Sequence, residues 1–284
     1  MRSIAVFALA VACIIGGPAF GADEAKKRTV VDDDVELAYR EAGDRSDPTL
    51  LLLHGLTDST HDWSLMMERL SKRFHVLALD QRGHGESAAP KYGYTVPRFA
   101  ADAIEFLDAM GIERAHVAGF SMGTFVAQHM AILAPDRVSK LVLIATANTA
   151  QGNPGLAWTW EKIQGFDQGV PDDFLDTWDD TVTAVPDAFV SKMKTIQKNT
   201  PLHVWRGATK MLMEHDHSPF LGKVDHPTLI LWGTEDAFFS KDDQKNLLDL
   251  LPNARLNTYN GTGHNIPWEE PQRAAKDMVE FLSD

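Results

Sequence analysis

The chain has 284 residues, of which 44% are hydrophobic and 24% charged, a balance typical of a globular protein with one α/β domain and an insertion. Its formal net charge of -13 disfavours nonspecific binding to nucleic acid or anionic lipid. We therefore expect a small-molecule partner, no nucleic acid and no stable membrane insertion, and leave the oligomeric state open.

Residues 1–21 predict a secretory signal peptide. Arg2 lies near the start, an apolar stretch covers Ile4 to Ile15, and small residues lead up to Gly21. The apolar stretch is short for a membrane span. The alternative is a lipoprotein signal acylated at Cys13, the only cysteine, since the residues before it loosely resemble a lipobox. We expect an exported chain, periplasmic or secreted, whose mature form has no disulfide.

Short apolar runs in the chain predict a parallel sheet. Alternation over Thr29–Tyr39 predicts a hairpin, and apolar residues recur at helical spacing over 99–110 and 275–282. Buried strands are expected at Leu50–Leu53, His75–Leu79, His116–Ala118, Leu141–Ala145 and Leu229–Trp232, and a last strand at Ala254–Tyr259. Alternating strands and helices indicate a doubly wound α/β fold.

This alternation breaks between Thr149 and Asp225, a segment rich in turns that holds four of the seven tryptophans. We interpret residues 149–225 as a helical lid, inserted between core segments 22–148 and 226–284. Most of its aromatic residues are expected to fix the lid to the core, and some to line a pocket. Trp160, Trp205 and Ile266 are the expected substrate contacts.

The sequence Gly119-Phe120-Ser121-Met122-Gly123 predicts a nucleophile elbow. The apolar run Ala115–Ala118 precedes it and a helix-like stretch, Thr124–Leu133, follows. A serine on such a strand-to-helix turn projects its hydroxyl, and the glycines allow the backbone to approach closely.

A serine hydroxyl needs a base, and that base needs an acceptor that fixes its tautomer. His264 follows the turn Asn260–Gly263 after the last strand, which can deliver an imidazole to the carboxyl edge of the sheet. Asp236 follows another strand by a short turn, with Glu235 as the nearest rival. The chain order Ser121, Asp236, His264 is typical of a triad on this architecture.

Acyl transfer also needs donors aimed at the oxyanion. The backbone amides of Met122 and Leu56 are the candidates, and we assign His54 a structural role. We interpret Glu214–His217 as a solvated loop and expect neither a metal nor a cofactor, because no known zinc spacing is present.

Taken together, these residues resemble the α/β-hydrolase superfamily over nearly all of the chain after residue 21. The resemblance implies a mostly parallel eight-stranded sheet with helices on both faces and a helical lid. Thr124 stands where many relatives have a second glycine. The matching motifs are His54-Gly55-Leu56 with Ser59 and Trp63, Asp80 to Ser87, the elbow, Gly233 to Asp236, and Gly263-His264 with Pro267, Glu270 and Pro271.

Within the superfamily the chain looks most like small esterases, haloperoxidase-like enzymes and meta-cleavage hydrolases. Ser121 disfavours epoxide hydrolases and haloalkane dehalogenases, which use an aspartate there. We expect a serine hydrolase that cleaves a carboxylic ester or lactone of a small, largely apolar molecule through an acyl-enzyme. The alternatives are cleavage of a carbon-carbon bond in a vinylogous diketo acid, perhydrolysis, and ligand binding without catalysis.

Overall fold

The computed structural model describes residues 27–31 and 35–284, so the expected signal peptide and Cys13 lie outside the described residues. The strands are β1 (Lys27–Val31), β2 (Val35–Ala42), β3 (Thr49–Leu53), β4 (His75–Leu79), β5 (Ala115–Phe120), β6 (Val138–Ile144), β7 (Thr228–Gly233) and β8 (Ala254–Tyr259). The helices are α1 (Met67–Leu70), α2 (Val96–Ala109), α3 (Met122–Leu133), α4 (Pro154–Gln164), α5 (Asp172–Trp178), α6 (Asp187–Asn199), α7 (Leu202–Glu214), α8 (Ser218–Leu221), α9 (Lys241–Leu250), α10 (Ile266–Glu269) and α11 (Pro271–Ser283), with 3-10 turns η2 (Thr60–Trp63) and η3 (Pro135–Arg137).

The strands form one sheet of eight in the order β1-β2-β4-β3-β5-β6-β7-β8. β2 pairs antiparallel with both β1 and β4, and the remaining neighbours pair parallel. The expected α/β class and the mostly parallel eight-stranded sheet are therefore confirmed.

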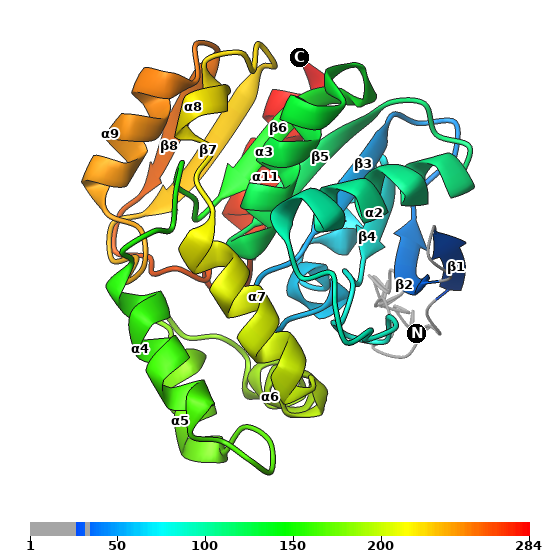
Figure 1. The fold of residues 1–284 in the computed structure, drawn as a ribbon. Helices are drawn as coiled ribbons and strands as arrows, with labels where there is room; N and C mark the ends of the chain where they lie inside the picture. Colours follow the sequence, from blue (N-terminus) through cyan, green and yellow to red (C-terminus); the bar gives the residue numbers. More distant parts are fainter. Residues whose placement is uncertain (1–26, 32–34) are drawn as a thin grey trace, which may run out of the picture.

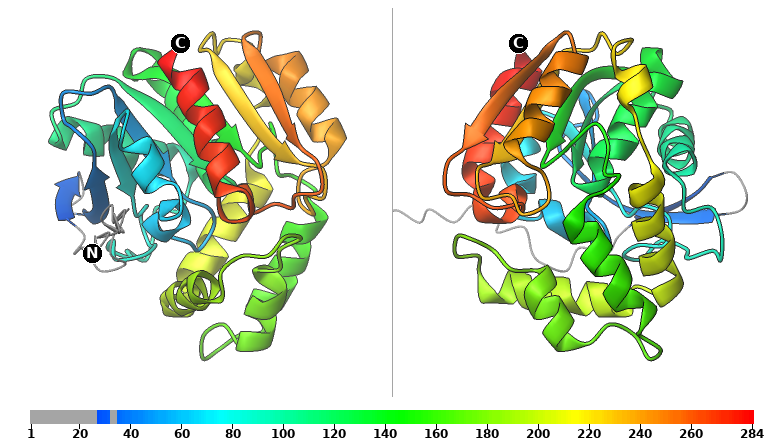
Figure 2. Two further views of the ribbon diagram at one scale, coloured as in Figure 1. Left: turned by 180° about the vertical axis from the view of Figure 1, so that it is seen from behind. Right: turned by 60° about the vertical axis from the view of Figure 1, so that its left-hand side comes forward.

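Helices cover both faces of this sheet because its strands are apolar on both sides. In β3, Leu51 and Leu53 belong to a buried cluster with apolar residues of α2, α3 and α9. Leu50 and Leu52 belong to a second cluster, with residues of α1 and α11. Successive side chains of a strand point to opposite faces, which separates the two clusters. Figure 1 shows α2, α3 and α9 on one face, and Figure 2 shows α11 on the other.

Helices α4 to α8 lie between β6 and β7 in the sequence, within the segment expected to be a lid. Figure 1 shows α4 to α7 grouped at one end of the sheet domain. Helices α4, α5 and α7 share a small core of their own that includes Ile163, Phe174 and Trp205, whereas Phe189 and Met193 of α6 pack with the sheet core. In the described part of the chain, no helix is long and apolar enough to cross a membrane.

Candidate active site

Ser121 lies on a strained turn between β5 and α3. Its backbone has φ 49° and ψ -116°, a conformation that L-residues rarely adopt. The turn is closed by hydrogen bonds from the Ser121 amide to the Ile144 carbonyl (2.9 Å) and from the Thr124 amide to the Ser121 carbonyl (2.9 Å). The Thr124 hydroxyl donates to the same carbonyl at 2.7 Å, so the departure from glycine there adds a hydrogen bond to the elbow.

The two glycines of the elbow are required by close backbone approach. A Cβ on Gly119 would lie 2.3 Å from the Gly123 carbonyl oxygen, and one on Gly123 would lie 2.1 Å from the Leu53 carbonyl oxygen. Neither neighbour is a flexible side chain, so a larger residue would push the nucleophile helix away from β5 at position 119 and away from β3 at position 123.

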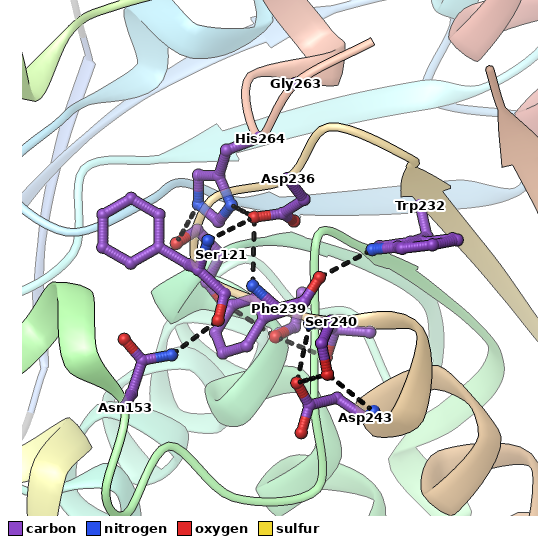
Figure 3. Close-up of polar contacts among 12 residues, drawn as sticks. Ser121, Asn153, Trp232, Asp236, Phe239, Ser240, Asp243, Gly263 and His264 are labelled. Carbon is purple, nitrogen blue, oxygen red and sulfur yellow. Dashed lines mark hydrogen bonds and ion pairs between the residues drawn. The ribbon is translucent and has the colours of Figure 1, made fainter. Parts of the chain in front are cut away.

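The structure brings Ser121, His264 and Asp236 into one hydrogen-bonded chain (Figure 3). His264 Nε2 lies 2.9 Å from Ser121 Oγ, and His264 Nδ1 lies 2.9 Å from Asp236 Oδ1. A proton on Nδ1 that is donated to Asp236 leaves Nε2 free to accept from the serine hydroxyl. The Asp236 side chain is fully buried, and Oδ1 also accepts from the amides of Phe238 (2.8 Å) and Phe239 (3.1 Å).

The loops that carry the acid and the histidine are joined to each other. The Thr234 amide donates to the Tyr259 carbonyl at 3.0 Å, and the Glu235 amide donates to the Thr262 carbonyl at 3.0 Å. Glu235 itself is exposed on the cavity wall, whereas Asp236 meets the imidazole. The local backbone therefore selects Asp236 over its neighbour as the orienting carboxylate.

The expected oxyanion donors, Leu56 and Met122, both lie on the wall of the same cavity as Ser121. Met122 begins α3, so its amide belongs to the first turn, which has no acceptor within the helix and lies at the positive end of the helix dipole. The loop that carries Leu56 is held by His54, whose Nδ1 lies 2.7 Å from the Gly55 carbonyl and whose Nε2 accepts from the Gln81 amide at 2.9 Å. These contacts give His54 a structural role.

The Asp80–Ser87 turn supports this region. Asp80 is buried and accepts from the amides of Thr60 (2.7 Å) and Glu86 (2.9 Å). Arg82 forms a buried, bidentate ion pair with Asp102 at 2.6 and 2.7 Å. Asp80 and Arg82 thus tie the turn to η2 and α2, and neither residue lines the cavity that holds Ser121.

A cavity of about 460 Å³ opens above Ser121. Its wall combines apolar residues from the core and the lid with four acidic side chains, and no lysine or arginine of the described residues lines it. The aromatic residues are Phe120, Phe125, Trp158, Trp178, Phe238, Phe239 and Trp268, and the acidic ones are Asp58, Asp179, Asp180 and Glu235.

The structure corrects the expected substrate contacts, because none of the three residues lines this cavity. Trp160 packs on the lid core, and Trp205 is fully buried there and donates from Nε1 to the Gln197 carbonyl at 3.2 Å. Ile266 is fully buried in the sheet core. Trp158 and Trp268 take the wall positions instead.

Sequence reasoning also missed an acidic cluster at the cavity wall. Gln197 Nε2 donates to Asp58 Oδ1 at 3.0 Å and to Asp179 Oδ1 at 2.8 Å, so one amide joins two carboxyl groups. Asp62 lies behind them and accepts from the Gly55 amide and Trp268 Nε1, each at 3.0 Å. Asp58 and Asp179 are both buried, and each has an exposed fraction of only 5%.

Burial controls the protonation of this cluster. Desolvation raises the pKa of Asp179 to about 7 and that of Asp62 to about 7. Desolvation, and then the neighbouring Asp62 and Asp179 charges, also raise the pKa of Asp58 well above its usual range. Asp179 and Asp62 thus change from largely neutral to charged near neutral pH.

Comparison with known proteins agrees with this architecture. A family model described as the alpha/beta hydrolase fold matches residues 48–271. The chain belongs to the α/β-hydrolase family. The match includes the elbow, the acid turn and the histidine loop, and it ends within the proline-containing segment after His264.

Relatives within this α/β-hydrolase family differ in their reactions. The chain is 26% identical to a 2-hydroxy-6-oxononadienedioate/2-hydroxy-6-oxononatrienedioate hydrolase from Paraburkholderia xenovorans, covering 89% of this chain and 92% of that protein. It is 27% identical to a bifunctional esterase/perhydrolase from Acinetobacter calcoaceticus, covering 88% and 97%. A solved hydrolase from Pseudomonas aeruginosa PA01 superposes with a TM-score of 0.81 at 26% identity, covering 91% and 98%.

Proposed function

We propose that this α/β hydrolase is a serine hydrolase that cleaves a carboxylic ester or lactone of a small, largely apolar molecule. The proposal depends above all on the hydrogen-bonded chain from Ser121 through His264 to Asp236 at a cavity with an aromatic wall. That arrangement supplies a nucleophile, its base and an orienting acid within one pocket.

In the proposed reaction, Ser121 Oγ attacks the acyl carbon while His264 Nε2 takes its proton. The Leu56 and Met122 amides stabilise the oxyanion, and collapse of the intermediate expels the alkoxide, which receives the proton from His264. Water, activated by His264, then attacks the acyl-enzyme and releases the acid. Asp236 holds the imidazole and stabilises its protonated form throughout.

The acidic wall of the cavity disfavours the main alternative reaction, which is carbon-carbon cleavage of a diketo acid. Such a substrate carries a carboxylate, which would have to enter a cavity lined by four acidic side chains and, in the part of the chain that the structure describes, by no lysine or arginine. Placing like charges together in a partly desolvated pocket is unfavourable. A neutral or cationic ester fits this wall better than an anionic substrate.

The test is acid release from a panel of short esters, long esters and lactones by the parent chain and by Ser121→Ala. We expect turnover of at least one ester or lactone by the parent and loss of most of the rate enhancement in the variant, which should remain folded. Equal rates in the two proteins would overturn the proposal.

Two further assays separate the alternatives that use the same triad. If Ser121 reacts with a fluorophosphonate but no ester is cleaved, a ring-fission diketo acid tests carbon-carbon cleavage, and halide oxidation in acetate and peroxide tests perhydrolysis. Failure of the fluorophosphonate to label Ser121 would instead favour the ligand-binding alternative.

We also propose that the protein acts outside the cytoplasm, in the periplasm or as a secreted enzyme. The support is the signal-like composition of residues 1–21. The intact mass of the exported protein tests this: loss of about the first 21 residues is expected, and an added diacylglyceryl group at Cys13 would identify a lipoprotein.

A further inference from the structure

A cluster of three histidines joins the nucleophile helix to the end of the lid. His129 lies on α3, near its carboxyl end, whereas His215 and His217 lie between α7 and α8. We expected Glu214–His217 to be a solvated loop. Glu214 is exposed, but His217 is fully buried, so that interpretation is wrong for the histidine that lies deepest.

The local backbone explains how two of these imidazoles come together. His215 has φ -93° and ψ 138°, an extended conformation, and the neighbouring Asp216 forms a β-bridge with Thr149. Residues two apart in an extended segment point to the same side. His215 and His217 therefore face α3, while Asp216 Oδ1 turns to accept from the Ser218 amide at 2.9 Å.

The imidazole nitrogens lie close to one another. One ligating nitrogen from each of the three histidines can be chosen so that all lie within 4.8 Å of one another. His129 Nδ1 is 3.2 Å from His217 Nε2. Among the described residues, His215 Nε2 and His217 Nδ1 are buried without a hydrogen-bond partner. Because His217 already meets His129 through Nε2, the unused ligand atom beside this pair is His215 Nε2, which the protein itself leaves without a hydrogen bond.

The spacing suits a small transition-metal ion. Three nitrogens bound to Zn²⁺ at about 2.0 to 2.1 Å in a tetrahedron are separated by about 3.3 Å, close to the distance between His129 and His217. The widest pair would have to close by at most about 1.5 Å from 4.8 Å, which rotation of an imidazole ring can provide. Burial lowers the pKa of all three histidines, so at neutral pH they are in the form that binds metals.

We propose that His129, His215 and His217 form a binding site for a divalent transition metal, with Zn²⁺ as the ion to test. Imidazole nitrogens favour Zn²⁺ over Mg²⁺ or Ca²⁺, and a three-histidine set leaves a fourth position for water. The ion would fasten the returning end of the lid to the helix that begins at the nucleophile. Phe125, one helical turn before His129, stacks on His217 and lines the catalytic cavity, so the site lies directly behind the cavity wall.

The experiment uses the chain without a polyhistidine tag, stripped of metal and titrated with ZnCl₂ by calorimetry. The variants are His129→Gln and His215→Asn, chosen because both residues are only half-buried, and the control is His203→Gln, an exposed lid histidine outside the cluster. We expect one Zn²⁺ per chain, at least about tenfold weaker binding in each cluster variant, and unchanged binding in the control. Near-ultraviolet circular dichroism checks that each variant is folded.

Thermal unfolding gives a second readout, independent of activity. Because an ion that binds only the folded state stabilises it by mass action, Zn²⁺ should raise the melting temperature of the parent and of His203→Gln but not that of His129→Gln. Absence of saturable Zn²⁺ binding, or binding that persists equally in His129→Gln and His215→Asn, would overturn the proposal and leave the cluster as a packing contact.

Discussion

The Asn153 side chain connects the lid to Phe238 in the acid turn. Its Nδ2 donates to the Phe238 carbonyl at 2.7 Å (Figure 3). Its Oδ1 accepts from the Leu156 amide at 3.0 Å and caps α4. The Phe238 amide in turn donates to Asp236. One side chain therefore fixes the first lid helix relative to the carboxylate that orients the catalytic imidazole.

Two substitutions separate the roles of Asn153. Asn153→Ala loses both hydrogen bonds, so it should lower the free energy of unfolding by about 1 kcal/mol and reduce kcat/KM about 3- to 10-fold. Asn153→Asp keeps an acceptor at the helix cap but loses the donor to Phe238, so stability should be retained while kcat/KM falls. Urea unfolding and ester kinetics measure the two effects. Full activity in both variants would show that the lid does not influence the acid turn through this contact.

The triad makes a sharp prediction for two adjacent carboxylates. Asp236→Asn should lower kcat about 10³- to 10⁴-fold, because the amide cannot stabilise the imidazolium and can favour the wrong tautomer. Its Oδ1 can still accept from Phe238 and Phe239, so the fold should persist. Glu235→Gln is the matched control, since Glu235 is the next residue and exposed, and its kcat should change by less than about threefold. Similar losses in both variants would contradict the assignment of Asp236.

Much of this site could be predicted from the sequence because its residues follow local signals. Ser121 lies between glycines at a strand-to-helix junction, and Asp236 and His264 each follow a buried strand by a short turn. The lid contacts could not be predicted in this way. Trp158 and Trp160 are two residues apart on α4, so they point to different sides, and only the packing of the lid decides that Trp158 meets the cavity. The histidine cluster was equally hidden, because His129 meets His215 and His217, which lie more than 80 positions further along the chain.

Asp179 should make stability depend on pH. Its pKa is raised to about 7 in the folded state, chiefly by desolvation, against about 3.9 when unfolded, so the folded state binds the extra proton. Stability should therefore fall as pH rises from about 4 to about 7 and then level off. Asp179→Asn removes this titration while keeping an acceptor for Gln197.

Thermal unfolding at pH 5 and pH 8 tests this sign. We expect the parent to lose at least about 3 °C more in melting temperature between these pH values than Asp179→Asn does. Asp62 and Asp58 remain in both proteins, so only the difference between them reports on Asp179. An identical fall in the two proteins would mean that Asp179 is already charged at pH 5.

The acidic wall predicts a preference among esters of one size. A choline ester and the matching 3,3-dimethylbutyl ester have nearly the same shape, but only the first carries a positive charge. Asp180 and Glu235 at the exposed part of the wall, together with Asp179, should favour the cation, and the aromatic rings offer it further stabilisation. We expect kcat/KM for the choline ester to exceed that for its neutral isostere by about tenfold at pH 8.

The ratio of the two kcat/KM values should decrease towards pH 6 as Asp179 gains its proton, because the folded pKa of Asp179 is about 7. Taking the ratio at each pH cancels the titration of the triad, which both substrates share. In Asp179→Asn the ratio should be smaller and should change less between pH 8 and pH 6 than in the parent, because only Asp62 and Asp58 still titrate beside the cavity. A ratio below one at pH 8, or one that depends on pH equally in the parent and in Asp179→Asn, would show that the wall does not select for charge.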